Sequence, residues 1–157
     1  EDRMVIQAMS DFKAGMRTIQ SDNESTEASL GEMRKQVERY YKSEFARRYQ
    51  AENSESQTDE QAFVNRLVLP LDAQAITLQY QYIQQNPNAL GSKELLDDPG
   101  DGSTYSQAHS VYHPIIRNYL QKFGYYDIFL VDIKSGNIVG LNIMIIIEIT
   151  ANIRTTI

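Results

Sequence analysis

Cysteine is absent from the chain, which excludes a disulfide, a thiolate metal site, a covalently attached haem and a cysteine nucleophile. Runs of lysine and arginine are missing too, and the formal net charge is −6. Because nucleic-acid binding needs clustered basic side chains that neutralise phosphates, we expect no nucleic-acid partner. The sequence begins at Glu1 and has neither a signal peptide nor an apolar run long enough to span a bilayer. We therefore expect a soluble piece of a longer protein.

Motifs of common catalytic and nucleotide-binding sites are also missing. Ser106, His109 and Asp101 lie near one another in sequence, but Ser106 lacks the Gly-x-Ser-x-Gly turn that exposes a nucleophile. The segment Gly100-Asp-Gly102 is typical of a turn and not of a phosphate-binding loop. His109 and His113 are four residues apart, which supplies half of a zinc site, whereas zinc needs three or four protein ligands. We expect no enzyme activity, no metal and no cofactor.

The size and composition are those of one globular domain. The chain has 157 residues, of which 41% are hydrophobic and 23% charged, close to ordinary globular usage. We expect a single domain over residues 1–157, with an N-terminal helical region (1–50), helices and a loop (59–122) and a sheet hairpin (125–149).

Two amphipathic helices are predicted at the start of the chain. Val5, Met9, Phe12, Met16 and Ile19 are spaced 4, 3, 4 and 3 residues apart, the seam of an amphipathic helix or a short coiled coil. We expect this helix to support a parallel homodimer; the alternative is that the stripe only packs onto the domain. Gly15 costs such a helix about 1 kcal/mol relative to alanine, so neighbouring residues must hold it in place. A second helix begins near Thr26, after a cluster of turn residues, and places apolar side chains on one face: Leu30, Met33, Val37, Tyr41, Phe45 and Tyr49.

The middle of the chain alternates helices and loops. The polar residues 51–60 predict a solvated loop, and helices are expected from about Asp59 to Pro70 and from Leu71 to Gln85. The second of these ends before Pro87, because proline disfavours helical geometry in the residue before it. Residues 88–102 read as mostly loop, in which Asp97 and Asp98 are expected to be solvated capping residues.

A long helix and a hairpin are predicted next. Ser103 or Thr104 can cap a helix that runs to about Lys122 and ends at Gly124, and Pro114 should kink or restart it. Two apolar segments flank the turn signal Lys134-Ser-Gly-Asn137 and predict an antiparallel hairpin, with strands over 125–133 and 137–149.

Aromatic residues are concentrated between Tyr80 and Phe129, where nine of them occur. Tyrosine combines apolar surface with a hydroxyl that needs a partner when buried, which suits a pocket for a small ligand. The alternative is that these rings pack the helix against the sheet. Arg117 follows His113 by four residues and could present its two-pronged guanidinium to a carboxylate, or could simply extend to water.

The stretch 101–137 also resembles a known family. Tyr105, His109, Tyr112, His113 and Pro114, followed by the phrase from Phe123 to Asp132, resemble the extracytoplasmic sensor domains of bacterial methyl-accepting chemotaxis receptors, which have a Cache (PAS-like) fold. The resemblance is looser over 78–93, covers roughly two thirds of the chain and stops after Val139.

The resemblance implies an α+β fold in which a long N-terminal helix and further helices pack on a small antiparallel PAS-like sheet. It implies a periplasmic sensor that is anchored in the inner membrane through segments outside this chain, forms a homodimer and recognises a small organic molecule such as a carboxylate or an amino acid. We expect the ligand-binding residues to be Tyr105, His109, Tyr112, His113, Arg117, Tyr125 and Tyr126. The alternatives are a non-catalytic dimerisation or interaction domain without a ligand, and a hydrolase that uses His109 and His113.

Overall fold

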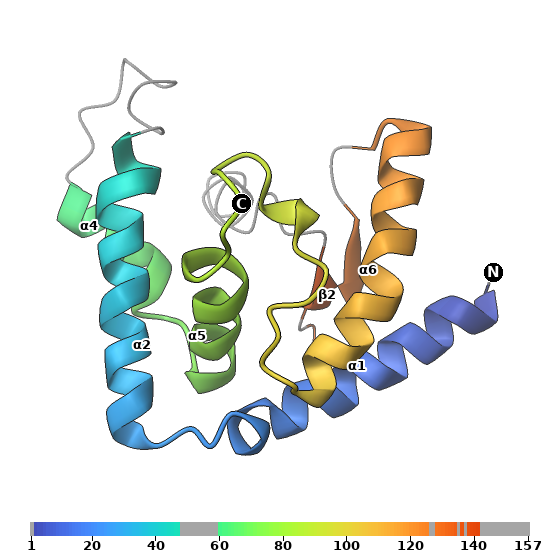
Figure 1. Ribbon diagram of the computed structural model, residues 1–157, viewed down its shortest axis with the longest axis horizontal. Helices are drawn as coiled ribbons and strands as arrows, with labels where there is room; N and C mark the ends of the chain where they lie inside the picture. Colours follow the sequence, from blue (N-terminus) through green and yellow to red (C-terminus); the bar gives the residue numbers. More distant parts are fainter. Residues whose placement is uncertain (1, 48–59, 126–127, 135, 137, 142–157) are drawn as a thin grey trace.

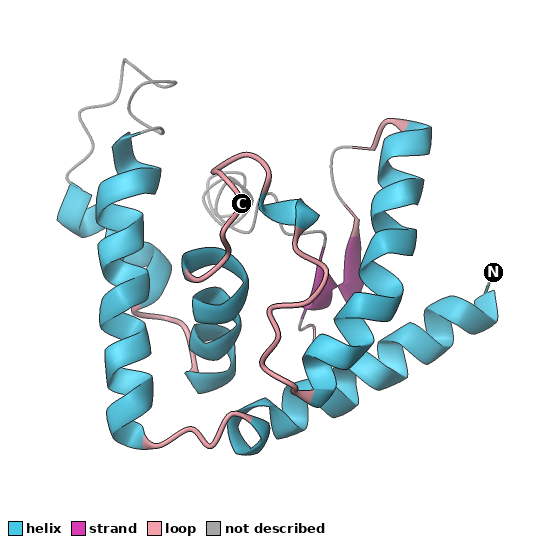
Figure 2. Ribbon diagram, viewed as in Figure 1, coloured by secondary structure: helices cyan, strands magenta, loops and turns pink. Residues whose placement is uncertain are grey.

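The computed structural model describes residues 2–47, 60–125, 128–134, 136 and 138–141 (Figure 1). Helices predominate, and the two strands of the described residues form one small antiparallel sheet (Figure 2). The predicted α+β class is confirmed at this level. Of the helices within the described ranges, none is both long enough and apolar enough to cross a membrane.

The chain begins with two helices joined by a short turn. Helix α1 spans Asp2–Asp22 and α2 spans Glu27–Tyr40, which confirms both predicted helices. Thr26 caps α2, because its hydroxyl accepts from the Ser29 amide at 3.1 Å while the Ser29 hydroxyl accepts from the Thr26 amide at 2.8 Å. A π-helical turn, η1 (Tyr41–Phe45), continues α2.

Three elements form the middle of the structure: α4 (Glu60–Val68), α5 (Ala73–Gln79) and the π-helical turn η2 (Tyr80–Gln84). Asp72 caps α5 by accepting from the Ala75 amide at 2.8 Å. After η2 the side-chain amide of Asn86 donates to the carbonyls of Tyr82 and Lys93, each at 2.8 Å. These bonds close the following loop, which contains a short 3-10 turn, η3 (Lys93–Leu95).

Helix α6 spans Thr104–Phe123 and carries most of the predicted site residues. Ser103 caps its first turn by accepting from the Ser106 amide at 3.1 Å, and Gly124 ends it in the left-handed conformation, with a φ of 65°. Pro114 was predicted to kink or restart the helix, and α6 continues through it without a restart. Proline removes a single backbone donor, and the buried side chains of His113 and Ile116 hold the helix on either side of it.

The sheet is a hairpin of β1 (Phe129–Val131) and β2 (Ile138–Leu141), with Phe129 opposite Leu141 and an irregularity after Leu130. The antiparallel pairing is therefore confirmed. The first strand is shorter than predicted, because Tyr125 and Ile128 precede it and Asp132 and Ile133 leave the sheet for the turn. Residues 142–149 of the predicted second strand, and the predicted loop at 51–59, lie outside the described residues.

Two hydrophobic clusters form the core. One joins α2, η1, α4, α5 and η2, and the other joins α1, η2, α6 and β2. The two clusters meet at η2, where Ile83 packs in the first and the neighbouring Tyr82 in the second. Phe12 and Ile19 of the α1 seam are both buried in the second cluster. These residues of the predicted seam therefore pack against other elements of the same chain.

Gly15 lets α1 and α6 approach closely. A Cβ atom at this position would lie 2.5 Å from the Tyr105 Cα and 2.6 Å from its backbone nitrogen. No larger residue fits unless the helices separate, which explains why a glycine stands inside an otherwise regular helix. The contact fixes the crossing point of the two helices that form the candidate site.

Candidate functional site

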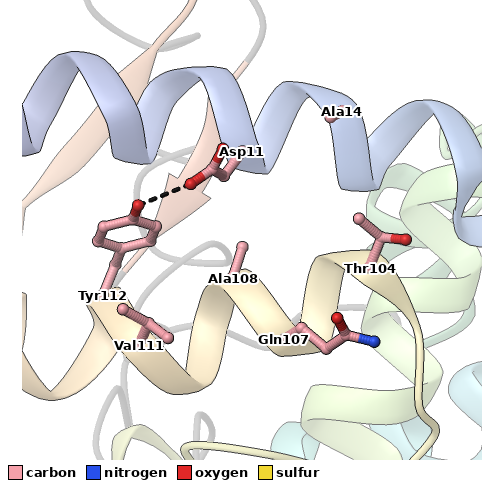
Figure 3. A pocket seen from close by; sticks show the side chains of 7 residues that line it. All are labelled: Asp11, Ala14, Thr104, Gln107, Ala108, Val111 and Tyr112. Atoms are coloured by element: carbon pink, nitrogen blue, oxygen red, sulfur yellow. Dashed lines mark hydrogen bonds between the residues drawn. The ribbon is translucent and has the colours of Figure 1, made fainter.

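The predicted site residues of α6 lie on two neighbouring faces of the helix. Tyr105, His109 and His113 are buried and follow one another at every fourth position, where residues share one face. The rings of His109 and His113 are stacked with centroids 4.2 Å apart, and the Tyr105 ring lies 6.2 Å from that of His109. Tyr112 lies on the adjoining face, toward α1 (Figure 3).

Asp97 binds three successive residues of the first face. Its backbone carbonyl accepts from Nδ1 of His109 at 2.8 Å, and its carboxylate oxygen Oδ1 lies 3.0 Å from Nδ1 of His113. Because a carbonyl oxygen and a carboxylate accept only, both imidazoles carry a proton on Nδ1. Arg117 Nη1 donates to the same Oδ1 at 2.7 Å, so its 3.3 Å separation from His113 Nδ1 is that of two donors sharing an acceptor.

The guanidinium fork of Arg117 is thus engaged with a carboxylate of the chain itself. Nη1 and Nη2 donate to Oδ1 and Oδ2 of Asp97 at 2.7 and 3.1 Å, and Nη1 also donates to the Glu94 carbonyl at 2.7 Å. The geometry is the bidentate one that arginine adopts with carboxylates. The Arg117 guanidinium lowers the pKa of the Asp97 carboxyl. An outside carboxylate would have to displace Asp97 to reach this fork.

His109 is a deeply buried titratable group on the first face of α6. Its ring is 1% exposed, and the Tyr82 and Phe12 rings lie 4.5 and 6.3 Å away. Burial, reinforced by the neighbouring His113, lowers the pKa of His109 to about 3. Its Nε2 atom, an acceptor in this tautomer, has no hydrogen-bond partner. His109 is therefore a neutral side chain of the core near pH 7.

An open groove of about 280 Å³ lies between α1 and α6, on the side of α6 that carries Tyr112 (Figure 3). Asp11 and Tyr112 stand at one end, and Thr104 and Gln107 at the other. The groove exists because the side chains between these ends are small; its remaining lining residues are Ala14, Ala108 and Val111.

Two polar contacts between α1 and α6 border the groove. The Tyr112 hydroxyl donates to Asp11 Oδ2 at 2.6 Å, and the Asp22 carboxylate accepts from the Thr104 amide at 2.8 Å. The carboxylate of Asp11 raises the pKa of the Tyr112 hydroxyl. The Thr104 amide lowers the pKa of Asp22. The groove is thus framed by side chains of both helices.

Of the predicted site residues that the structure describes, Tyr112 alone lines the groove. Tyr125 is exposed near the C-terminal end of α6, and its ring contacts Phe123 with centroids 5.8 Å apart. Tyr126 lies outside the described residues. Among the residues that the structure describes, no group of three histidine or acidic residues is arranged to hold a metal ion.

Sequence reasoning missed Asp97 and Asp11. Asp97 was expected to be solvated like its neighbour Asp98, whose Oδ1 accepts from the Gly100 amide at 2.8 Å within a turn. Asp97 lies in a loop, 12, 16 and 20 residues before its partners on α6, so helical spacing could not predict these contacts. Asp11 occupies an ordinary polar position of an amphipathic helix and becomes distinctive only through the pairing of α1 with α6.

Comparison of the chain with protein-family models, with curated proteins and with solved structures found no match. The resemblance to Cache sensor domains, and the function that it implies, therefore remain predictions.

Proposed function

We propose that the chain is a non-catalytic, ligand-binding sensor domain of Cache (PAS-like) type, the periplasmic part of a bacterial chemotaxis or signal-transduction receptor. The observation that carries the proposal is the groove between α1 and α6, to which both helices contribute side chains. Its volume, about 280 Å³, lies just below the ~300–1,000 Å³ typical of ligand pockets, so its occupant would be a small organic molecule.

The position of the groove suits signal transfer. A ligand held between α1 and α6 contacts both helices, and it can shift their relative position only if it binds one arrangement more tightly than the other. Helix α1 is the first helix of the chain, and in the proposed receptor it would follow a membrane anchor outside this sequence. A homodimer that brings two α1 helices together belongs to the same proposal.

A second candidate, a dimerisation or interaction domain without a ligand, is favoured by apolar side chains on the outside of the same two helices. Ile6 of α1 is 68% exposed and Ile115 of α6 is 37% exposed. Isolated exposed apolar residues are common on protein surfaces, so this observation weighs less than a groove with polar ends.

A thermal-shift screen separates the candidates. We expect a panel of small organic acids, amino acids and amines to contain a compound that raises the melting temperature of the wild-type domain. Ala14→Leu should abolish that shift, because Ala14 is exposed and lines the groove, while leucine is also a good helix former. Ala28→Leu, at an exposed position of α2, is the matched control.

The outcomes differ for each candidate. A shift that survives Ala14→Leu would place binding elsewhere and contradict the proposal, and no shift with any compound would favour the interaction domain. A shift produced by zinc and reversed by a chelator would favour the hydrolase alternative.

A further inference from the structure

We infer that the groove between α1 and α6 binds a small organic cation, with Asp11 as its counter-ion. The inference rests on the proposed ligand-binding function and adds the chemical class of the ligand. It depends on three features of the groove: the hydrogen bonds that Asp11 already makes, the chemistry of the walls, and the lack of a basic residue among the described residues that line it.

The Asp11 carboxylate is held by neutral donors. Tyr112 donates to Oδ2 at 2.6 Å and the side-chain amide of Gln7 donates to Oδ1 at 2.8 Å. No lysine, arginine or histidine among the described residues forms an ion pair with it. Each carboxylate oxygen accepts more than one hydrogen bond, so both can still accept from an ammonium group. Asp11 is thus an oriented negative charge that no cation of the described residues pairs with.

The walls beside Asp11 suit the rest of an alkylammonium ion. The Tyr112 ring lies next to the carboxylate, and an aromatic face attracts a cation electrostatically (Figure 3). Ala14, Ala108 and Val111 supply short apolar surface along the groove, against which methylene or methyl groups can pack. A primary amine with a short alkyl chain, or a compact quaternary ammonium ion, matches both the Asp11–Tyr112 end and the apolar walls of the groove.

The described residues that line the far end of the groove, Thr104 and Gln107, are polar and uncharged. Gln107 donates its side-chain amide to the Gly102 carbonyl at 3.1 Å, which leaves its amide oxygen as an acceptor. Thr104 lies beside the carboxylate of Asp22. An anionic ligand would face Asp11 at one end and Asp22 near the other, and no basic residue is among the described residues that line the groove. The groove therefore discriminates against a carboxylate that lacks an ammonium group.

Three probes of equal length and different charge test the inference: n-butylammonium, butan-1-ol and butyrate. At low ionic strength, where screening is weak, we expect n-butylammonium to shift the backbone amide resonances of Asp11, Ala14 and Ala108 in a saturable way. Butan-1-ol should bind at least tenfold more weakly, and butyrate should leave these resonances unchanged.

Two variants locate the binding. Asp11→Asn keeps the shape of the side chain and its acceptor for Tyr112 but removes the charge, so the affinity for n-butylammonium should fall at least tenfold. Glu38→Gln removes one negative charge from α2. It should change the affinity for n-butylammonium only as much as the altered net charge does. Ala14→Leu should block binding with Asp11 intact. Circular dichroism and melting temperature verify that each variant is folded.

Each contrary result is informative. Equal binding of n-butylammonium to wild type and Asp11→Asn would overturn the inference, as would tighter binding of butyrate. If a neutral or anionic compound binds and Ala14→Leu blocks it, the sensor proposal survives while the cation inference fails. If no compound of either panel binds in the groove, both fail.

Discussion

His109 is a titratable side chain that the fold holds in its neutral form. Its Nδ1 proton is bonded to the Asp97 carbonyl, its ring is enclosed by aromatic neighbours, and burial lowers its pKa to about 3. In the unfolded chain the same imidazole has a pKa near 6.5. Between these two values the unfolded state binds a proton that the folded state does not, so stability must fall as the pH is lowered.

His109→Asn tests this pH dependence. Asparagine keeps an N–H donor near the Nδ1 position but does not titrate. We expect the wild-type free energy of unfolding to fall between about pH 6.5 and pH 3, with a contribution from His109 of up to ~1.4 kcal/mol per pH unit. The variant should be less stable at pH 7, because it leaves a cavity, but its pH profile should be flatter. The free energies of unfolding of both proteins are measured by urea denaturation at several pH values. If they change with pH in parallel, His109 is protonated in the folded state, which would contradict this prediction.

Asp97 is predicted to stabilise the fold through Arg117 and His113. Asp97→Asn should lower the free energy of unfolding at pH 7 by about 1–3 kcal/mol, because it weakens charge-assisted bonds to a guanidinium and a buried imidazole. Asp98→Asn is the matched control, since the Asp98 side chain bonds only to a local turn among the described residues.

The pH dependence of this effect has a definite sign. The pKa of Asp97 is lowered in the folded state, chiefly by the bond from Arg117. Its contribution is therefore fully present above the ordinary aspartate pKa of about 3.9 and is lost as the pH falls through the lower, folded value. The difference between wild type and Asp97→Asn should narrow below about pH 4. A constant difference down to acid pH would contradict an ionised pair.

At the scale of elements, the crossing of α1 and α6 depends on Gly15. Substitution by alanine normally favours a helix interior by up to ~1 kcal/mol, but here the added methyl group would meet the Tyr105 backbone at 2.5 Å. We expect Gly15→Ala to destabilise the domain by about 1–3 kcal/mol and to widen the crossing. Denaturation with Gly31→Ala as control checks this, because Gly31 lies in α2 with open space around it.

The two glycine variants should have opposite effects. Gly31→Ala should be neutral or stabilising, and Gly15→Ala clearly destabilising. If both stabilise the domain equally, the close approach of the helices is not the reason for glycine at position 15.

Most elements, but few of the contacts between them, could be predicted from the sequence. Cap residues such as Thr26 and Ser103 act locally, so the helix starts were predictable. The shared side of His109 and His113 followed from helical spacing. Their partner Asp97 did not, because the path of the loop after η2 depends on tertiary bonds such as those of Asn86. The groove depends on how two distant helices cross, which periodicity does not encode.

At the scale of the whole molecule, the two clusters of the core share the turn η2. Tyr82 joins it to α6, since its hydroxyl lies 2.8 Å from that of Ser106. Adjacent residues of η2, Tyr82 and Ile83, therefore belong to the two clusters, so the core is continuous from the α1–α6 crossing to α2 and α4. This continuity is what a domain that relays the position of α1 requires.

The proposed homodimer must use the outward face of α1. Phe12, at the centre of the predicted seam, is 1% exposed and packs on α6, whereas Ile6 is 68% exposed. The N-terminal end of α1 extends beyond α6 (Figure 1). We expect Phe12→Glu to unfold the domain, because it introduces an unpaired charge into the core and removes an aromatic side chain. Ile6→Glu should leave the free energy of unfolding within about 0.5 kcal/mol of wild type while it weakens self-association.

Sedimentation velocity over a range of concentrations, combined with urea denaturation, distinguishes the two effects. A stable, monomeric Phe12→Glu variant would mean that the seam faces a second chain and that α1 does not pack on α6 as described. If wild type and Ile6→Glu associate equally, the exposed end of α1 is not the dimer contact. A loss of association in Ile6→Glu alone, with unchanged stability, would locate the partner on the outward face of α1, where it could follow any shift of α1 relative to α6.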